Sequence, residues 1–162
     1  LNHAGFANSA VVNIRWVDSE TLSAAESCTG GYISHLVTMV SGSSSYYLGS
    51  VTSYAIKIKE RVLGVPAETI DKNGVVSSEV AAAMAEGVRA LTGSTWSVAT
   101  TGLAEGGDER YPEGTVWIGV SGPNGTKTII YHCDLGRKAN IRRFARVALE
   151  TLEDYITKEA IH

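Results

Sequence analysis

Short apolar runs alternate with amphipathic stretches along most of the chain. Segments 21–27 and 96–101 consist mainly of small and β-branched residues and predict buried strands. Segment 46–54 is rich in aromatic and β-branched residues and predicts a third strand. Between these strands, 33–40 repeats apolar residues at the spacing of one helix face. The pattern therefore indicates strands connected by helices.

Further helices are predicted where charged residues surround an apolar stripe. Gly64 and the nearby Pro66 are expected to end the first of them, and Ser77 is expected to cap a later one. The longest helix carries its apolar residues on a single stripe toward the end of the chain. These helical segments cover 55–63, 78–91 and about 137–157, and 67–71 is expected to form a second short turn.

A β-hairpin is predicted before the last helix, because strand-like segments 115–120 and 126–133 flank the turn sequence Gly122-Pro123-Asn124-Gly125. A tight hairpin joins antiparallel strands, so the sheet should be mixed. The predicted fold class is α/β: a three-layer α/β/α sandwich with a mixed central sheet in a single domain. Residues 1–20 are expected to be a divergent N-terminal segment, in which 10–17 is compatible with a short helix or an edge segment, and 21–162 form the domain.

Charge and cysteine content mainly exclude classes of function. The net charge is −3, without a block of like charges, so direct nucleic-acid binding and attachment to an anionic membrane are not expected. No apolar run approaches the roughly 18 residues of a membrane span. Cys28 and Cys133 lack CxxC spacing and the histidines lack metal-ligand spacing. We therefore expect a cytoplasmic protein without disulfide, metal or cofactor.

The junction Ser27-Cys28-Thr29-Gly30-Gly31 is the first candidate for chemistry. It would place hydroxyl and backbone N–H groups at the start of a helix, where a phosphate binds or a serine is presented for attack. An ordinary strand-to-helix turn capped by Thr29 is the alternative. The serine-rich segment 41–45 has the composition of a solvated turn.

Tyr54 and Lys59 form a second candidate. If Tyr54 ends a strand and Lys59 lies on the following helix, both reach one cleft, and a lysine shielded from water can lose its proton near neutral pH and act as a base. The alternative is an exposed lysine beside Lys57. Thr101 ends another strand, before a loop (104–113) whose acidic residues are expected to be solvated.

The ordered series of these motifs resembles the CinA C-terminal domain family over roughly residues 21–155. Family members are known as competence/damage-inducible proteins, and many are nicotinamide-nucleotide amidases, which hydrolyse nicotinamide mononucleotide to nicotinic acid mononucleotide and ammonia. Larger members carry an additional N-terminal nucleotide-binding domain, and this chain resembles the stand-alone form. The matching motifs are Ala25-Glu26-Ser27-Cys28-Thr29-Gly30-Gly31, Gly42-Ser43-Ser44, Tyr54 with Lys59, Leu63-Gly64-Val65-Pro66, Asn73-Gly74-Val75-Val76-Ser77, Thr101-Gly102-Leu103-Ala104 and Gly114-Thr115-Val116-Trp117.

The resemblance implies a site and a mechanism. Ser27 would attack the nicotinamide carboxamide and Lys59 would take its proton, with Tyr54 hydrogen-bonding or relaying between them. Backbone N–H groups near Thr29–Gly31 would bind the oxyanion or the phosphate. The substrate-binding residues implied are Thr29, Gly30, Gly31, Ser44, Thr101, Arg137 and Arg142, with Lys138 as the alternative to Arg137.

The chain departs from the family pattern at two places. Residues 104–108 replace the usual Gly-Pro-Gly-Gly, and Glu105 would repel a nucleotide phosphate or reshape the mouth of the pocket. Residues 1–18 do not resemble the helix that precedes the first strand in the family. The departures leave two alternatives to an amidase: a non-catalytic nucleotide-binding or interaction module linked to competence or DNA damage, and a Ser–Lys hydrolase of another amide or ester. A small-molecule nucleotide is the expected partner, and homo-oligomerisation is left open.

Overall fold

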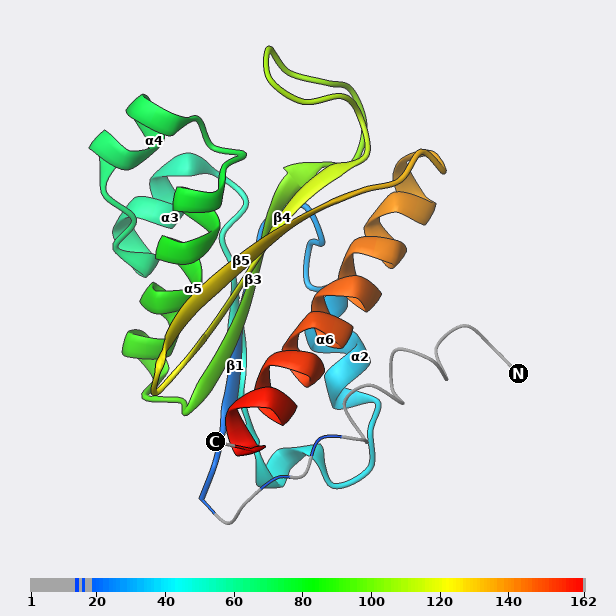
Figure 1. The fold of residues 1–162 in the computed structure, drawn as a ribbon. Coiled ribbons are helices and arrows are strands. Elements are labelled where there is room, and N and C mark those ends of the chain that lie inside the picture. The colour runs from blue at the N-terminus through cyan, green and yellow to red at the C-terminus, as the bar shows by residue number, and fades with distance from the viewer. Residues whose placement is uncertain (1–13, 15, 17–18, 162) are drawn as a thin grey trace.

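The computed structural model describes Ile14, Trp16 and residues 19–161 (Figure 1). In this part of the chain, five strands form one sheet in the order β2-β1-β3-β4-β5. Strand β1 is parallel to β2 and β3, whereas β4 is antiparallel to β3 and β5. The predicted mixed sheet is confirmed. The strands are β1 Leu22–Glu26, β2 Tyr47–Thr52, β3 Trp96–Leu103, β4 Thr115–Gly122 and β5 Gly125–His132.

Helices cover both faces of the sheet, as predicted for a three-layer sandwich (Figure 1). Helices α2 and α6 pack on one face, and α3, α4 and α5 pack on the other. Alternate residues of β1 face the two layers: Ala24 lies in the core with α2 and α6, and Ala25 lies in the core with α5. The helices are α2 Tyr32–Thr38, α3 Ile56–Leu63, α4 Ala67–Asn73, α5 Ser78–Thr92 and α6 Arg137–Ile161, and Ser43–Ser45 form a short 3-10 turn, η1.

Local signals in the sequence account for most element boundaries. The Ser77 hydroxyl accepts a hydrogen bond from the Val80 N–H at 3.2 Å and caps α5, as predicted. Strand β3 runs two residues beyond the predicted end, because its pairing with β4 continues to Leu103. Gly102 permits this pairing, since a Cβ there would lie 2.6 Å from the Thr115 carbonyl oxygen. Helix α6 extends four residues beyond the predicted Thr157.

Most of the segment 1–20 lies outside the described residues, and so does most of the stretch 10–17. Two described residues of this segment pack on the domain: Ile14 is buried in the core that includes α2 and α6, and the Trp16 ring stacks on Tyr46 with 4.2 Å between ring centroids. Within the described part of the chain, no helix has the length and apolar character needed to cross a membrane.

Candidate active site

The carboxyl ends of β1 and β2 bring Ser27 and Lys59 together. Ser27 directly follows β1, and Lys59 lies on α3, the helix after β2. Because β1 and β2 are parallel neighbours, the residues that follow them meet at one edge of the sheet. The Lys59 amine nitrogen lies 2.8 Å from the Ser27 hydroxyl oxygen. The predicted pair is therefore formed although its members are 32 residues apart.

Lys59 is held in an unusual environment for an amine. The side chain is 1% exposed, and its Nζ donates to the carbonyl oxygens of Ser53 at 2.6 Å and Tyr54 at 3.0 Å. None of the ion pairs among the described residues involves Lys59. Burial lowers the pKa of Lys59 from 10.5 to about 8, because the charged form loses its hydration.

The three contacts of Nζ fit a neutral amine that acts as a base. A neutral amine has two N–H donors and one lone pair. With its two protons on the carbonyls of Ser53 and Tyr54, the lone pair faces the Ser27 hydroxyl, which then donates to it. After taking the proton, the ammonium has three donors for the same three oxygen atoms. The environment therefore accommodates both protonation states.

Glu26, which the sequence analysis gave no role, fixes the turn that carries Ser27. Its carboxylate is fully buried and accepts the Thr29 hydroxyl at 2.6 Å. It also accepts backbone N–H groups of Gly31, Ile33 and Ser34 at 3.2, 2.9 and 3.0 Å. The carboxylate thus caps the start of α2, where the helix dipole favours a negative charge. An acidic residue just before a predicted helix start was the available signal.

This arrangement corrects the prediction that the Gly30 and Gly31 N–H groups and the Thr29 hydroxyl are free to bind an anion. The Gly31 N–H is bound by Glu26, the Gly30 N–H donates to the Ser27 carbonyl at 3.1 Å, and the Thr29 hydroxyl lies between Glu26 and Thr100. The negative charge that the start of α2 attracts is supplied by the chain itself. Thr29, Gly30 and Gly31 therefore shape the turn, and none of them lines the cavity beside Ser27.

A cavity of about 270 Å³ opens beside the Ser27–Lys59 pair. Of the residues predicted for the site, Thr101 and Arg137 line it together with Tyr54. The remaining lining comes from the loop before α3, the segment before α5, and the end of β3 with its loop. The lining residues are Ser27, Cys28, Tyr54, Ile56, Lys59, Val75, Val76, Thr101, Gly102, Leu103, Ala104, Glu105 and Arg137.

Tyr54 lines this cavity, but its phenol does not lie between Ser27 and Lys59. Those two side chains are in direct contact, and Lys59 is bonded to the Tyr54 carbonyl instead. The Tyr54 side chain is 64% exposed, and its hydroxyl accepts from Arg137 at 3.5 Å. The prediction that the Tyr54 phenol relays a proton between Ser27 and Lys59 is therefore wrong. Tyr54 contacts Lys59 through its backbone carbonyl, because it precedes α3 and its side chain points to the mouth of the cavity.

Arg137 and Glu105 face each other across the mouth of the cavity. A guanidinium nitrogen of Arg137 lies 3.6 Å from the Glu105 carboxylate, and both side chains are largely exposed. Asn140, which is fully buried, joins the loop that carries Glu105 to the segment just before α6: it donates to the Ala104 carbonyl at 2.9 Å and accepts the Leu135 N–H at 3.0 Å. Of the two basic residues predicted as alternatives for phosphate binding, Arg137 lines this cavity and Lys138 does not.

Ser44 and Arg142 lie away from the cavity, in contrast to the prediction. Ser44 belongs to η1, before the amino end of β2, whereas Ser27 follows the carboxyl end of the parallel β1. The five-residue length of β1, about 16 Å, separates the two edges. Arg142 is five residues beyond Arg137 on α6, which turns it about 140° around the helix axis. It lines a different cavity.

Two further findings concern a cysteine nucleophile and a metal ion as alternatives in this cavity. Cys28 lines the cavity, but burial raises the pKa of its thiol to about 12, so it is a poor nucleophile at neutral pH. Among the described residues there is no group of three or more His, Cys, Asp and Glu side chains that could hold a metal ion. The Ser27–Lys59 pair has the geometry of a hydroxyl beside a base in this cavity.

Fold and site together define an α/β protein with a buried serine–lysine pair at the carboxyl edge of a mixed sheet, and comparisons with known proteins give the family. The CinA C-terminal domain profile matches residues 6–156. A CinA-like protein of Desulfosudis oleivorans is 46% identical over 158 residues, which is 94% of this chain and 38% of that protein. The chain belongs to the CinA C-terminal domain family, and it spans well under half the length of this relative.

Solved structures of the family have the same fold. Competence damage-inducible protein A (ComA) of Klebsiella pneumoniae is 27% identical with a TM-score of 0.89, covering 96% of this chain and 98% of that chain. Competence/damage inducible protein CihA of Agrobacterium tumefaciens is 31% identical with a TM-score of 0.82, covering 92% of each chain. The predicted family and fold class are confirmed.

Proposed function

We propose that this chain is a nicotinamide mononucleotide amidohydrolase, which releases ammonia and nicotinic acid mononucleotide. The observation that carries the proposal is the 2.8 Å contact between the buried Lys59 amine and the Ser27 hydroxyl beside a cavity. A serine becomes a nucleophile when a base removes its proton, and a desolvated lysine is such a base near neutral pH. Membership of the CinA family supports the choice of amide substrate.

In the proposed reaction, the Ser27 oxygen attacks the carboxamide carbon while its proton passes to Lys59. Collapse of the tetrahedral intermediate breaks the C–N bond, and the Lys59 ammonium returns the proton to the departing nitrogen, which leaves as ammonia. A water molecule then attacks the Ser27 ester and gives a proton to Lys59. This proton returns to the Ser27 oxygen as the carboxylic acid product leaves.

Arg137 is the proposed partner of the substrate phosphate. It lies at the mouth of the cavity, and a guanidinium binds phosphate oxygens in pairs. Glu105 competes for the same guanidinium, and this contact favours the second candidate, a nucleotide-binding module without turnover. An exposed ion pair is weak, however, and a phosphate dianion can displace a single carboxylate from it.

The direct test is ammonia release from nicotinamide mononucleotide by the wild type and by Ser27→Ala. We expect turnover by the wild type and a loss of at least about a thousand-fold in the variant, because the nucleophile is gone. Ser50→Ala is the matched control, since Ser50 is exposed on the edge strand β2. Nucleotide binding without ammonia release would favour the module, and cleavage of a phenyl ester alone would favour the other Ser–Lys hydrolase.

The proposed contact between Arg137 and the substrate phosphate is tested by comparing Arg137→Ala with Lys138→Ala. Loss of Arg137 should raise KM for the mononucleotide and change KM for the unphosphorylated riboside much less. Lys138 is exposed and does not line the cavity, so its variant should behave like the wild type. An equal effect of the two variants would contradict a specific phosphate contact at Arg137.

A further inference from the structure

A second cavity, of about 430 Å³, lies between α2 and α6 on the far side of α6 from Arg137. It shares no residue with the cavity beside Ser27. Four of its residues lie on α6 at positions i, i+3, i+4 and i+7, so they form one face of the helix. The lining residues are Tyr32, Leu36, Leu135, Ala139, Arg142, Arg143 and Arg146.

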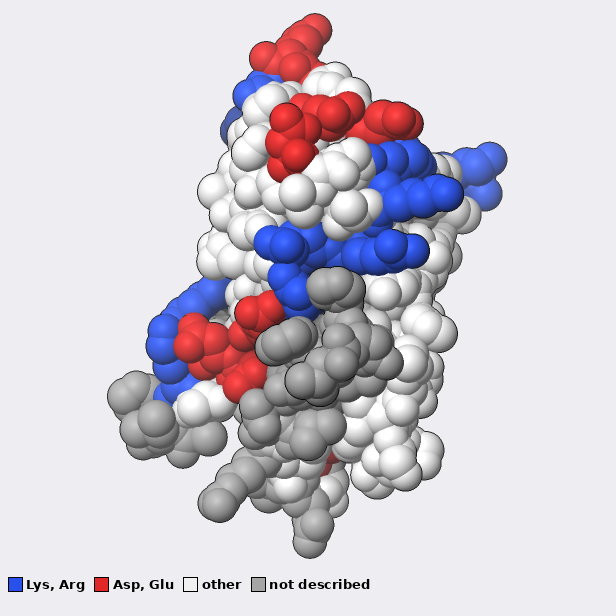
Figure 2. Space-filling view, turned by 90° about the vertical axis from the view of Figure 1, so that its right-hand side faces the viewer, with Lys and Arg blue, Asp and Glu red and all other residues white. Residues whose placement is uncertain are grey.

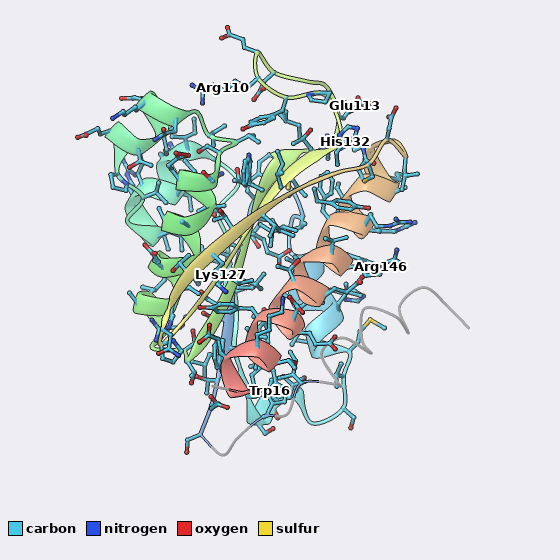
Figure 3. The ribbon with its side chains drawn as sticks, in the orientation of Figure 1. Trp16, Arg110, Glu113, Lys127, His132 and Arg146 are labelled. Atoms are coloured by element: carbon cyan, nitrogen blue, oxygen red, sulfur yellow. The ribbon has the colours of Figure 1, made fainter. Side chains whose placement is uncertain are left out.

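The cavity carries more positive charge than its neighbours neutralise. Among the described residues, Arg142 has no hydrogen bond or ion pair, and Arg143 donates to the Tyr131 hydroxyl at 3.4 Å. Arg146 lies 3.6 Å from the Glu150 carboxylate. The cavity therefore has three guanidinium groups, and among the described residues one carboxylate, that of Glu150, forms an ion pair with them. Figure 2 shows basic side chains gathered on this face, and Figure 3 shows Arg146 on α6 pointing away from the sheet.

The rest of the lining is apolar or aromatic. Leu36 is buried at the side of α2, Ala139 adds a small apolar surface, and Leu135 is half exposed. Tyr32 contributes a ring that the structure leaves partly exposed. A guanidinium group can donate two parallel hydrogen bonds to two oxygens of one phosphate, and it can also stack on an aromatic ring. The cavity thus offers anion donors next to a surface suited to an apolar or aromatic group.

We propose that this cavity is a second binding site, which takes a phosphorylated small molecule with a ring, such as a nucleoside diphosphate. Its volume lies within the range of about 300–1,000 Å³ that is typical of small-ligand sites. The charge is local, because the protein as a whole has a net charge of −3, which argues against a nucleic-acid surface. The proposal is independent of the reaction at Ser27.

The test is a calorimetric titration at low salt with three compounds: ADP, inorganic diphosphate and adenosine. The wild type should bind ADP saturably, and the double variant Arg142→Ala/Arg146→Ala should bind it at least about tenfold more weakly, because two charge-assisted contacts are lost. Arg143 stays in place in this variant. Circular dichroism and thermal unfolding check that the double variant is folded.

Two control variants distinguish binding at this cavity from binding at the Ser27 cavity and from a general effect of lost positive charge. Arg137→Ala removes the guanidinium at the mouth of the Ser27 cavity and should leave the affinity for ADP within about twofold. Lys57→Ala/Arg61→Ala removes two exposed cations from α3, on the other face of the sheet, and should also leave it within about twofold.

Four results would overturn the proposal. They are the absence of saturable ADP binding by the wild type, an equal loss in the α3 double variant, a loss in Arg137→Ala with binding retained in Arg142→Ala/Arg146→Ala, and diphosphate binding as tightly as ADP. The last would show that the ring adds nothing. Ammonia release in the same variants reports separately on the reaction at Ser27, so the two proposals can fail independently.

Discussion

Replacement of Lys59 by methionine tests the central physical claim, that folding buries an amine at a cost that depends on pH. Methionine has a similar length and no charge, and Lys59 is 1% exposed, so the change removes the ionisable group without opening a large space. The variant also leaves the carbonyls of Ser53 and Tyr54 without their donor. That loss is the same at every pH.

The pH-dependent part follows from the two pKa values. The pKa of Lys59 is about 8 in the folded protein and 10.5 in a solvated lysine. Between these values the unfolded chain binds the proton and the folded chain does not, so the stability of the wild type rises with pH across this window. The difference between these two pKa values corresponds to about 3 kcal/mol, and the full cost of the buried charge is present below pH 8.

The assay is urea unfolding of the wild type and Lys59→Met at pH 7, 8.5 and 10.5. Relative to the variant, the wild type should gain about 3 kcal/mol between the first and the last pH. Tyr47 is present in both proteins and Lys59 is not among the causes of its raised pKa, so its titration cancels in the difference. Lys57→Met controls for the loss of one exposed lysine from the same helix. A stability difference that stays constant from pH 7 to 10.5 would refute a lowered pKa at Lys59.

Three further predictions concern the base Lys59, the buried carboxylate of Glu26, and the ion pair between Glu105 and Arg137. The kcat/KM for the amide should rise about tenfold between pH 7 and 9, because the neutral fraction of a base with a pKa of about 8 rises by that factor; a profile flat over this range would exclude Lys59 as the base. Glu26→Gln should lower the melting temperature by about 4–8 °C, since a buried carboxylate that accepts four hydrogen bonds is worth roughly 2 kcal/mol or more; an unchanged melting curve would contradict its capping role. Glu105→Gln should lower KM for the mononucleotide about two- to fivefold with kcat unchanged, because the Arg137 guanidinium is released from its ion pair. Steady-state kinetics with the mononucleotide, and with the riboside as comparison, measures this change. An unchanged KM would mean that the ion pair does not compete with the phosphate.

Secondary structure was accessible from the sequence because its signals are local. The apolar spacing of α2, the Ser77 cap of α5 and the two-residue turn between β4 and β5 each act within a few residues. The errors lie at element ends, where distant partners decide. Strand β3 continues to Leu103 because β4 pairs with it, and no local pattern reports that pairing.

The candidate site was predicted in part. Ser27 and Lys59 could be singled out because each follows a predicted strand, and parallel strands bring such positions to one edge. Ser44 belonged to the same family motifs but precedes its strand, and strand direction places it at the opposite edge. Glu26 was overlooked because its position just before a predicted helix start was the one local signal, and that signal does not identify the backbone N–H groups that it binds.

The chain by itself determined the α/β class and the mixed sheet, since these follow from periodicity and turn residues. It also marked Ser27 and Lys59 as separate candidates at strand ends, and their pairing was expected from the resemblance to the CinA family. Only the tertiary structure decided which polar groups face one another across those ends. It showed that Glu26 occupies the start of α2, that the Tyr54 carbonyl meets Lys59, and that Arg137 and Arg142 face different cavities. Contacts of this kind depend on the orientation of side chains around helices and across strands that are distant in sequence, which no local pattern encodes.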